Sequence, residues 1–119
     1  MKKLLIASIT AITVSSLTSF VAPQAQAADV AQSLCEYVAA DDKKRMRSFL
    51  KSNKVKIRNV FKGIECNGQN LLAFAASRGS VETGSLIISK LPKSTVSDNL
   101  AFLTGSQPLA DAANERVSS

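Results

Sequence analysis

The stretch KGIECNGQNLLAFAASRGS, residues 62–80, contains the strongest local structural signals in the chain. Asn67-Gly68 is a dipeptide typical of a tight turn. Asn70 is suited to cap a helix. Leucine and alanine then recur at helical spacing until Gly79, a residue typical of helix C-termini. We therefore expect a turn that leads into a helix ending at this glycine.

A second helix pattern follows directly after the glycine. Ser80 can cap this helix, and apolar residues recur until Leu91-Pro92, where proline stops a helix. Residues 70–91 are therefore predicted to form a helix hairpin.

Two further helices are predicted upstream, because apolar residues again recur at helical spacing. The first spans residues 28–40 and places Cys35 on its apolar face. The second spans residues 42–52 and is amphipathic, and the pair Asp41-Asp42 before it can cap it. Residues 53–62 alternate between apolar and basic side chains, which predicts a short extended segment or strand.

The composition shifts from Lys93 onward to serine, threonine, asparagine, glutamine and alanine. Residues 98–103 are predicted to form a short helix that docks on the core. Beyond Gly105 we expect a mobile tail. The predicted fold is thus mainly α, with a helical domain at 28–92 and a partly disordered C-terminal tail at 93–119.

The N-terminus has the pattern of a secretory signal peptide. The basic residues of MKK (1–3) precede an uncharged, mostly apolar run at 4–21, and AQA (25–27) places small residues before a cleavage site. We expect cleavage between Ala27 and Ala28, which makes residues 1–27 the signal peptide.

A retained membrane anchor is the alternative, because no charge occurs between Lys3 and Asp29, a distance that could span a bilayer. Seven serine and threonine residues at 4–21 lower the hydrophobicity of the run, which favours cleavage. The expected product is an exported protein, periplasmic or secreted, without a permanent membrane anchor.

The chain has two cysteines, Cys35 and Cys66. An even number of cysteines in an exported chain predicts a disulfide. This bond would close a loop of about 32 residues and stabilise the fold by about 3–4 kcal/mol. The alternative is an exchangeable redox pair, but such pairs usually lie close together as Cys-x-x-Cys.

Two stretches, LCEYVAADDKKRMR (34–47) and IECNGQNLLAFA (64–75), carry a resemblance to a known family. Each joins a cysteine to a turn or capping motif. They resemble a family of short exported bacterial proteins that contain a domain of unknown function, over roughly residues 30–92. The resemblance implies a single exported domain and carries no assigned activity.

A weaker resemblance concerns GQNLLAFAASRGSVETGSLII, residues 68–88, which is similar to one ankyrin repeat. Residues 38–51 give a fainter echo of it. The usual Thr-Pro and His are replaced by Asn70, Leu71 and Ala73. This resemblance implies only that helix hairpins pack in a similar way.

The composition argues against catalysis. The chain contains no histidine, which removes histidine-based acid–base chemistry and the commonest metal ligand. Paired thiols would not form a zinc site. We expect no catalytic residue, no metal and no cofactor. A thiol–disulfide or other small periplasmic enzyme is the alternative.

The most unusual feature is a run of basic residues. The chain carries a formal net charge of +6, and no acidic residue occurs between the first and last member of the run. The nine members are Lys43, Lys44, Arg45, Arg47, Lys51, Lys54, Lys56, Arg58 and Lys62.

This run has two interpretations. It is either a solvated face, as most charge runs are, or a patch that binds an anionic partner. In the envelope that partner would be a lipid headgroup, a lipopolysaccharide phosphate, an acidic glycan or an acidic protein. Nucleic acid is not expected because the protein is exported. The leading hypothesis is a non-enzymatic structural or interaction role, and a membrane-active basic protein is a further alternative.

Overall fold

The computed structural model describes residues 22–119, with side chains from residue 28 onward. This part of the chain contains helices and no named strand. In chain order the elements are α1 (Ala22–Ala39), α2 (Lys43–Ser52), α3 (Ile57–Val60), the 3-10 helix η1 (Phe61–Gly63), α4 (Leu71–Arg78), α5 (Val81–Lys90), α6 (Lys93–Asp98), the 3-10 helix η2 (Leu100–Leu103) and α7 (Gln107–Ser118).

The mainly α fold predicted from the sequence is confirmed. Most of the predicted signal peptide, residues 1–21, lies outside the described residues. Helix α1 begins at Ala22, upstream of the cleavage bond predicted between Ala27 and Ala28, so that cleavage stays a prediction. No helix in the described part of the chain is both long and apolar enough to cross a membrane.

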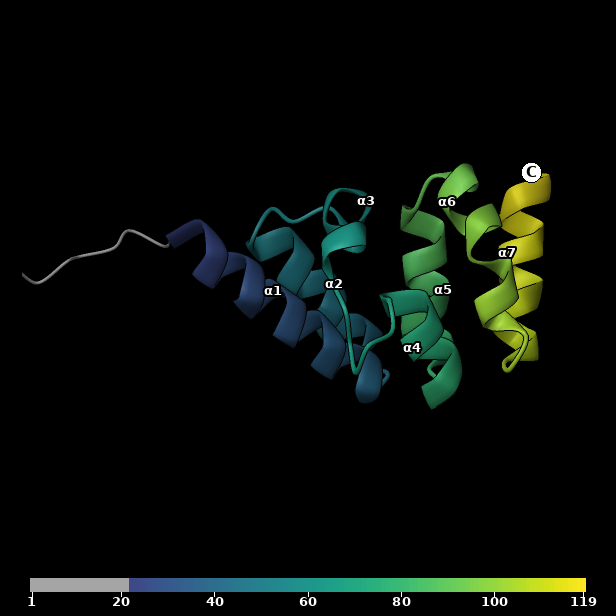
Figure 1. The fold of residues 1–119 in the computed structure, drawn as a ribbon, viewed down its shortest axis with the longest axis horizontal. Helices are drawn as coiled ribbons and strands as arrows, with labels where there is room; N and C mark the ends of the chain where they lie inside the picture. Colours follow the sequence, from purple (N-terminus) through teal and green to yellow (C-terminus); the bar gives the residue numbers. More distant parts are fainter. Residues whose placement is uncertain (1–21) are drawn as a thin grey trace, which may run out of the picture.

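The helices are arranged in a row that runs from α1 at one end to α7 at the other (Figure 1). Three units follow one another along this row: α1 with α2, then α4 with α5, then α6 and η2 with α7. Helix α4 packs on α1, and α5 packs on both α2 and α7. Each unit therefore buries its apolar face against the next unit along the row.

The core follows the same row and is densest at α4. All six residues from Leu71 to Ala76 are buried, so the helix is covered on every side up to its last two residues. The neighbouring helices add further buried apolar side chains. These are Leu34 and Val38 of α1, Met46 and Leu50 of α2, Leu86, Ile87 and Ile88 of α5, and Leu109 and Ala113 of α7.

The helix hairpin predicted at residues 70–91 is confirmed. The side-chain oxygen of Asn70 accepts a hydrogen bond from the backbone N–H of Ala73 at 2.8 Å, which caps α4. Gly79 ends the helix in the left-handed region, with φ of 68°. A residue without Cβ adopts this conformation at little cost.

The extended segment predicted at residues 53–62 is wrong. This stretch contains α3 and the start of η1. Ile57 and Phe61 are both buried and lie four residues apart, which is the spacing of one helical face. Because the described residues contain no strand with which to pair, burial of this face decides the local structure.

The mobile tail predicted beyond Gly105 is also wrong. Helix α7 occupies Gln107–Ser118, and its Leu109 and Ala113 are fully buried. The short docking helix predicted at residues 98–103 corresponds to η2, in which Leu103 is buried. The C-terminal segment is thus the third unit of the row.

Candidate anion-binding pocket

The double aspartate fixes the start of the basic helix α2. Asp42 caps it, since its carboxylate accepts a hydrogen bond from the backbone N–H of Arg45 at 3.0 Å. Asp41 has φ of 52°, in the left-handed region. This backbone conformation directs its carboxylate to the first turn of α5 rather than to α2.

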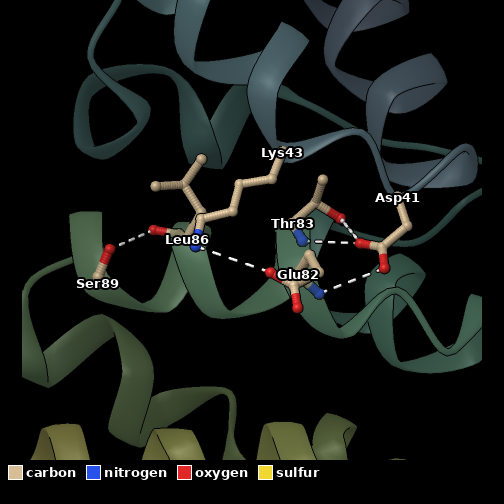
Figure 2. A network of polar contacts seen from close by, with 6 residues as sticks. All are labelled: Asp41, Lys43, Glu82, Thr83, Leu86 and Ser89. Carbon is tan, nitrogen blue, oxygen red and sulfur yellow. Dashed lines mark hydrogen bonds and ion pairs between the residues drawn. The ribbon is translucent and has the colours of Figure 1, made fainter.

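At α5 the Asp41 carboxylate accepts hydrogen bonds from the backbone N–H and the hydroxyl of Thr83, at 2.8 and 3.0 Å (Figure 2). A longer contact of 3.4 Å joins it to the backbone N–H of Glu82. The carboxylate therefore satisfies N–H groups that a helix leaves open at its N-terminus. It holds α2 in a fixed position relative to α5.

The cap predicted for Ser80 is corrected by the same geometry. Ser80 is at the N-cap position of α5 but makes no side-chain cap there. Its hydroxyl donates instead to the carbonyl oxygen of Val38, at 2.5 Å. Asp41 performs the capping because α1 and α2 are packed against α5.

Two members of the basic run have acidic partners. The ammonium group of Lys43 lies 3.8 Å from a carboxylate oxygen of Glu82 (Figure 2). The guanidinium of Arg45 lies 3.4 Å from the carboxylate of Asp42. These are the two ion pairs recorded within the described part of the chain.

Other members of the run gather around a pocket of about 480 Å³. It lies where α2, the segment leading into α3, the C-terminal end of α5 and helix α7 meet. Among the described residues that line it, none is acidic and six are cationic. The six pocket cations are Arg47, Lys51, Lys56, Arg58, Lys90 and Arg116.

The rest of the pocket lining is mainly apolar. Leu50, Ile57 and Leu91 are almost fully buried, whereas Val55 and Pro92 are half-buried. The pocket thus combines an apolar lining with cationic side chains. Such a mixture of apolar surface and a few polar groups is typical of ligand sites.

Arg116 is the pocket cation with a recorded hydrogen bond. Its Nη2 donates to the carbonyl oxygen of Leu91 at 3.1 Å, directly after the last residue of α5. Its Nε is buried and has no hydrogen-bond partner. This contact orients the guanidinium across the end of α5.

The structure brings together only part of the predicted patch. Arg47, Lys51, Lys56 and Arg58 line the pocket, and the other five members of the run do not. Those five are Lys43, Lys44, Arg45, Lys54 and Lys62.

Sequence reasoning missed two cations of the pocket. Lys90 lies outside the run, and Arg116 lies in the segment expected to be mobile. A helix pattern with Pro108 near its start was the one available signal for α7.

The predicted disulfide is confirmed. Cys35 and Cys66 are bonded, with their Cα atoms 5.7 Å apart, and they join α1 to the segment before α4. The turn predicted at Asn67-Gly68 is also present, and both residues have positive φ. The backbone groups of Cys66 and Gln69 hydrogen-bond each other across it, at 2.6 and 3.0 Å.

A second, shallower depression of about 320 Å³ lies beside this disulfide. Glu36 and Glu65 line it, and its lining includes no lysine or arginine among the described residues. Cys66 is almost fully buried. Cys35 is half-buried and lines the depression. Reactive thiolates usually lie next to positive charge, which this lining does not provide among the described residues.

The comparisons agree with the resemblance seen in the sequence. A family model described as "Protein of unknown function (DUF3718)" matches residues 34–98. This segment includes both cysteines, the double aspartate, the turn, the helix hairpin and α6, but not α7. No curated protein and no solved structure matches the chain. Because the match covers more than half of the chain, the protein belongs to the family of unknown function DUF3718.

Proposed function

We propose that this protein is an exported envelope protein with a non-enzymatic role, and that its basic surface binds an anionic partner. The observation that carries the proposal is the pocket, whose described lining contains six cationic side chains and no acidic one. A solvated face would not require cations from separate elements to converge on one depression.

The electrostatics of the pocket favour a bound anion. The ion pairs of the described residues involve Lys43 and Arg45, so none of the six pocket cations is paired in this part of the chain. Like charges held close together repel each other, and the repulsion is stronger near an apolar surface than in bulk water. A bound anion would relieve this repulsion.

Export is supported by the disulfide and by the signal pattern of the N-terminus. Disulfides persist in oxidising compartments such as the periplasm. The same bond lies beside two glutamates rather than beside cations. These surroundings support a structural role for the bond over a thiol–disulfide enzyme.

The test is a pull-down from envelope extract with the protein as cells process it, at about 50 mM and about 200 mM salt. We expect an anionic component to be retained at low salt and lost at high salt. Retention should also be lost when the seven members of the run without an ion pair are changed to glutamine. Those seven are Lys44, Arg47, Lys51, Lys54, Lys56, Arg58 and Lys62.

A smaller control changes Arg78 to glutamine, because this cation is exposed and lies outside both the run and the pocket; Lys93 is kept because it contacts Ser119 at the end of α7. This control should retain the component like the wild type. The proposal would be contradicted if the amount of component retained changes neither with salt nor with the seven substitutions. Leakage of anionic vesicles caused by the protein would instead favour the membrane-active alternative.

A further inference from the structure

We infer that the pocket takes a phosphate-bearing ligand that also has an apolar part, a phosphorylated amphiphile. This inference rests on the proposed function and narrows it from the whole basic surface to one site and one class of ligand. Three features of the pocket carry it: the origin of its cations, their chemistry and the apolar lining.

The six pocket cations come from separate parts of the fold. Arg47 and Lys51 lie one helical turn apart on the same side of α2. Lys56 and Arg58 flank the buried Ile57. Lys90 and Arg116 come from the last turns of α5 and α7. The site therefore depends on the packing of all three units and is absent from any single helix.

The chemistry of the cations favours phosphate over carboxylate. Three of them are arginines, Arg47, Arg58 and Arg116, and a planar guanidinium matches the oxygens of a carboxylate or a phosphate with two parallel hydrogen bonds, so charge decides between the two. A phosphate monoester carries a charge of about −1.5 to −2 at pH 7, whereas a carboxylate carries one charge. Several converging cations are better balanced by the larger charge.

Arg116 is oriented before a ligand arrives. Its hydrogen bond to the carbonyl oxygen of Leu91 fixes part of the guanidinium, and the group has further N–H donors for an anion. Orientation in advance reduces the entropy lost on binding. The same hydrogen bond also places a positive charge at the C-terminal end of α5, where the helix dipole favours it.

The apolar lining indicates the second part of the ligand. The volume of about 480 Å³ is within the range of small-molecule sites and leaves room beside a bare phosphate. The half-buried Val55 and Pro92 present apolar surface to this space, beside Leu50, Ile57 and Leu91, which are almost fully buried. An apolar group of the ligand placed here would leave water and cover the exposed parts of Val55 and Pro92, which favours binding.

Two sources could supply this chemistry: the headgroup region of a phospholipid in a bilayer, and a soluble phosphorylated molecule. The experiment uses dihexanoyl phosphatidic acid below its micelle concentration as the probe, and titration calorimetry as the readout. Inorganic phosphate and hexanoate serve as comparison ligands, since each has only one of the two chemical features.

We expect phosphatidic acid to bind at least about tenfold more tightly than either comparison ligand. The pocket variant, Lys51→Gln with Lys56→Gln and Lys90→Gln, should lose about tenfold or more of this affinity. The control variant, Lys44→Gln with Lys54→Gln and Lys62→Gln, removes the same charge from exposed residues outside the pocket. It should bind like the wild type.

Folding is checked by thermal unfolding of each variant, and all six lysines are exposed, so little change is expected. A second pocket variant, with the same three lysines changed to arginine, keeps the charge and should bind.

Sedimentation with phosphatidic acid vesicles then distinguishes the two sources of the ligand. Co-sedimentation that the soluble probe reverses identifies the bilayer, and binding of the soluble probe without co-sedimentation identifies a soluble ligand.

Equal loss of affinity in the pocket and control variants would overturn the inference and leave the proposed function standing, because the charge would then act diffusely. If the wild-type protein does not bind the probe but still retains an anionic component from envelope extract, the inferred ligand class is wrong. If neither the probe nor any envelope component binds, both proposals fail.

Discussion

The carboxylate of Asp41 joins the first two helix units through its hydrogen bonds to Thr83. The two residues lie 42 positions apart in the chain. The left-handed backbone of Asp41 is uncommon for a residue with a side chain, although aspartate adopts it more readily than most. This conformation is retained because it places an acceptor at the open N–H groups of α5.

We predict that Asp41→Ala lowers the free energy of unfolding by about 1–2 kcal/mol, the usual cost of losing a helix cap. Asp41→Asn should cost less, because asparagine keeps an acceptor and tolerates the left-handed region. Urea unfolding monitored by circular dichroism measures both. Asp98→Ala, at an exposed carboxylate, is the control. Equal stability of the two alanine variants would contradict the role of Asp41.

Local signals in the sequence predict the caps that act on their own helix. Asp42, Asn70 and Gly79 each lie next to the element that they begin or end, so their residue type is sufficient. The roles of Asp41 and Ser80 depend on which helices pack together. Nothing in the adjacent residues shows this, and the sequence predicts only that such polar groups require a partner.

At the scale of the element, α5 and α7 approach closely at Gly84. A Cβ atom at this position would lie 2.6 and 2.8 Å from the Cδ atoms of Leu109, and 3.3 Å from the Cβ of Ala75. Leu109 is fully buried, so it has little room to move away. The glycine is therefore required by packing rather than by its backbone conformation.

We predict that Gly84→Ala lowers the free energy of unfolding by about 1–2 kcal/mol, because the cost of overpacking exceeds the gain in helix propensity. Thermal and urea unfolding measure the change. Gly105→Ala is the matched control, since a Cβ atom there would meet nothing within 4 Å. A Gly84→Ala variant as stable as the wild type would show that α7 packs more loosely.

The elements that could be predicted are those with long or well-capped patterns, such as α2 and the helix hairpin. Helix α3 has only four residues, and a short alternation of apolar and basic residues suits a strand equally well. In α7 the buried face is small, consisting of Leu109 and Ala113. Its polar composition is typical of disorder, and only packing against α5 makes it a helix.

At the scale of the whole molecule, the three units are connected unequally. The disulfide Cys35–Cys66 links the first unit to the segment that begins the second. The third unit is joined by noncovalent contacts, among them the hydrogen bond of 2.7 Å from Asn70 to Asn99 and the one from Arg116 to Leu91. The pocket lies where all three units meet.

We predict that Cys35→Ser with Cys66→Ser lowers the free energy of unfolding by about 3–4 kcal/mol, since the unfolded chain gains the entropy of an open loop. Urea unfolding under oxidising and reducing conditions measures the effect. Reductant should destabilise the wild type to the same extent and leave the double variant unchanged. If the free energy of unfolding of the wild type is the same with and without reductant, the bond does not stabilise the fold.

The position of the pocket could not be predicted, because it depends on the order in which the units stack. The run between Lys43 and Lys62 supplies four of its cations, and their charge was evident in the sequence. Lys90 and Arg116 join them only because α5 and α7 end on the same side of the row (Figure 1). The charge of each residue can be read from the sequence, whereas the convergence of these cations on one pocket depends on the fold.

The unequal connection of the units also determines which pieces separate when a protease cuts the chain. Proteins open locally, and the regions held by the fewest interactions open first. In this row the end that carries α7 has no disulfide to its neighbours within the described residues, whereas the opposite end has one. A cut between Cys35 and Cys66 would leave both pieces joined by the disulfide, whereas a cut before α7 would release the segment that contributes Arg116.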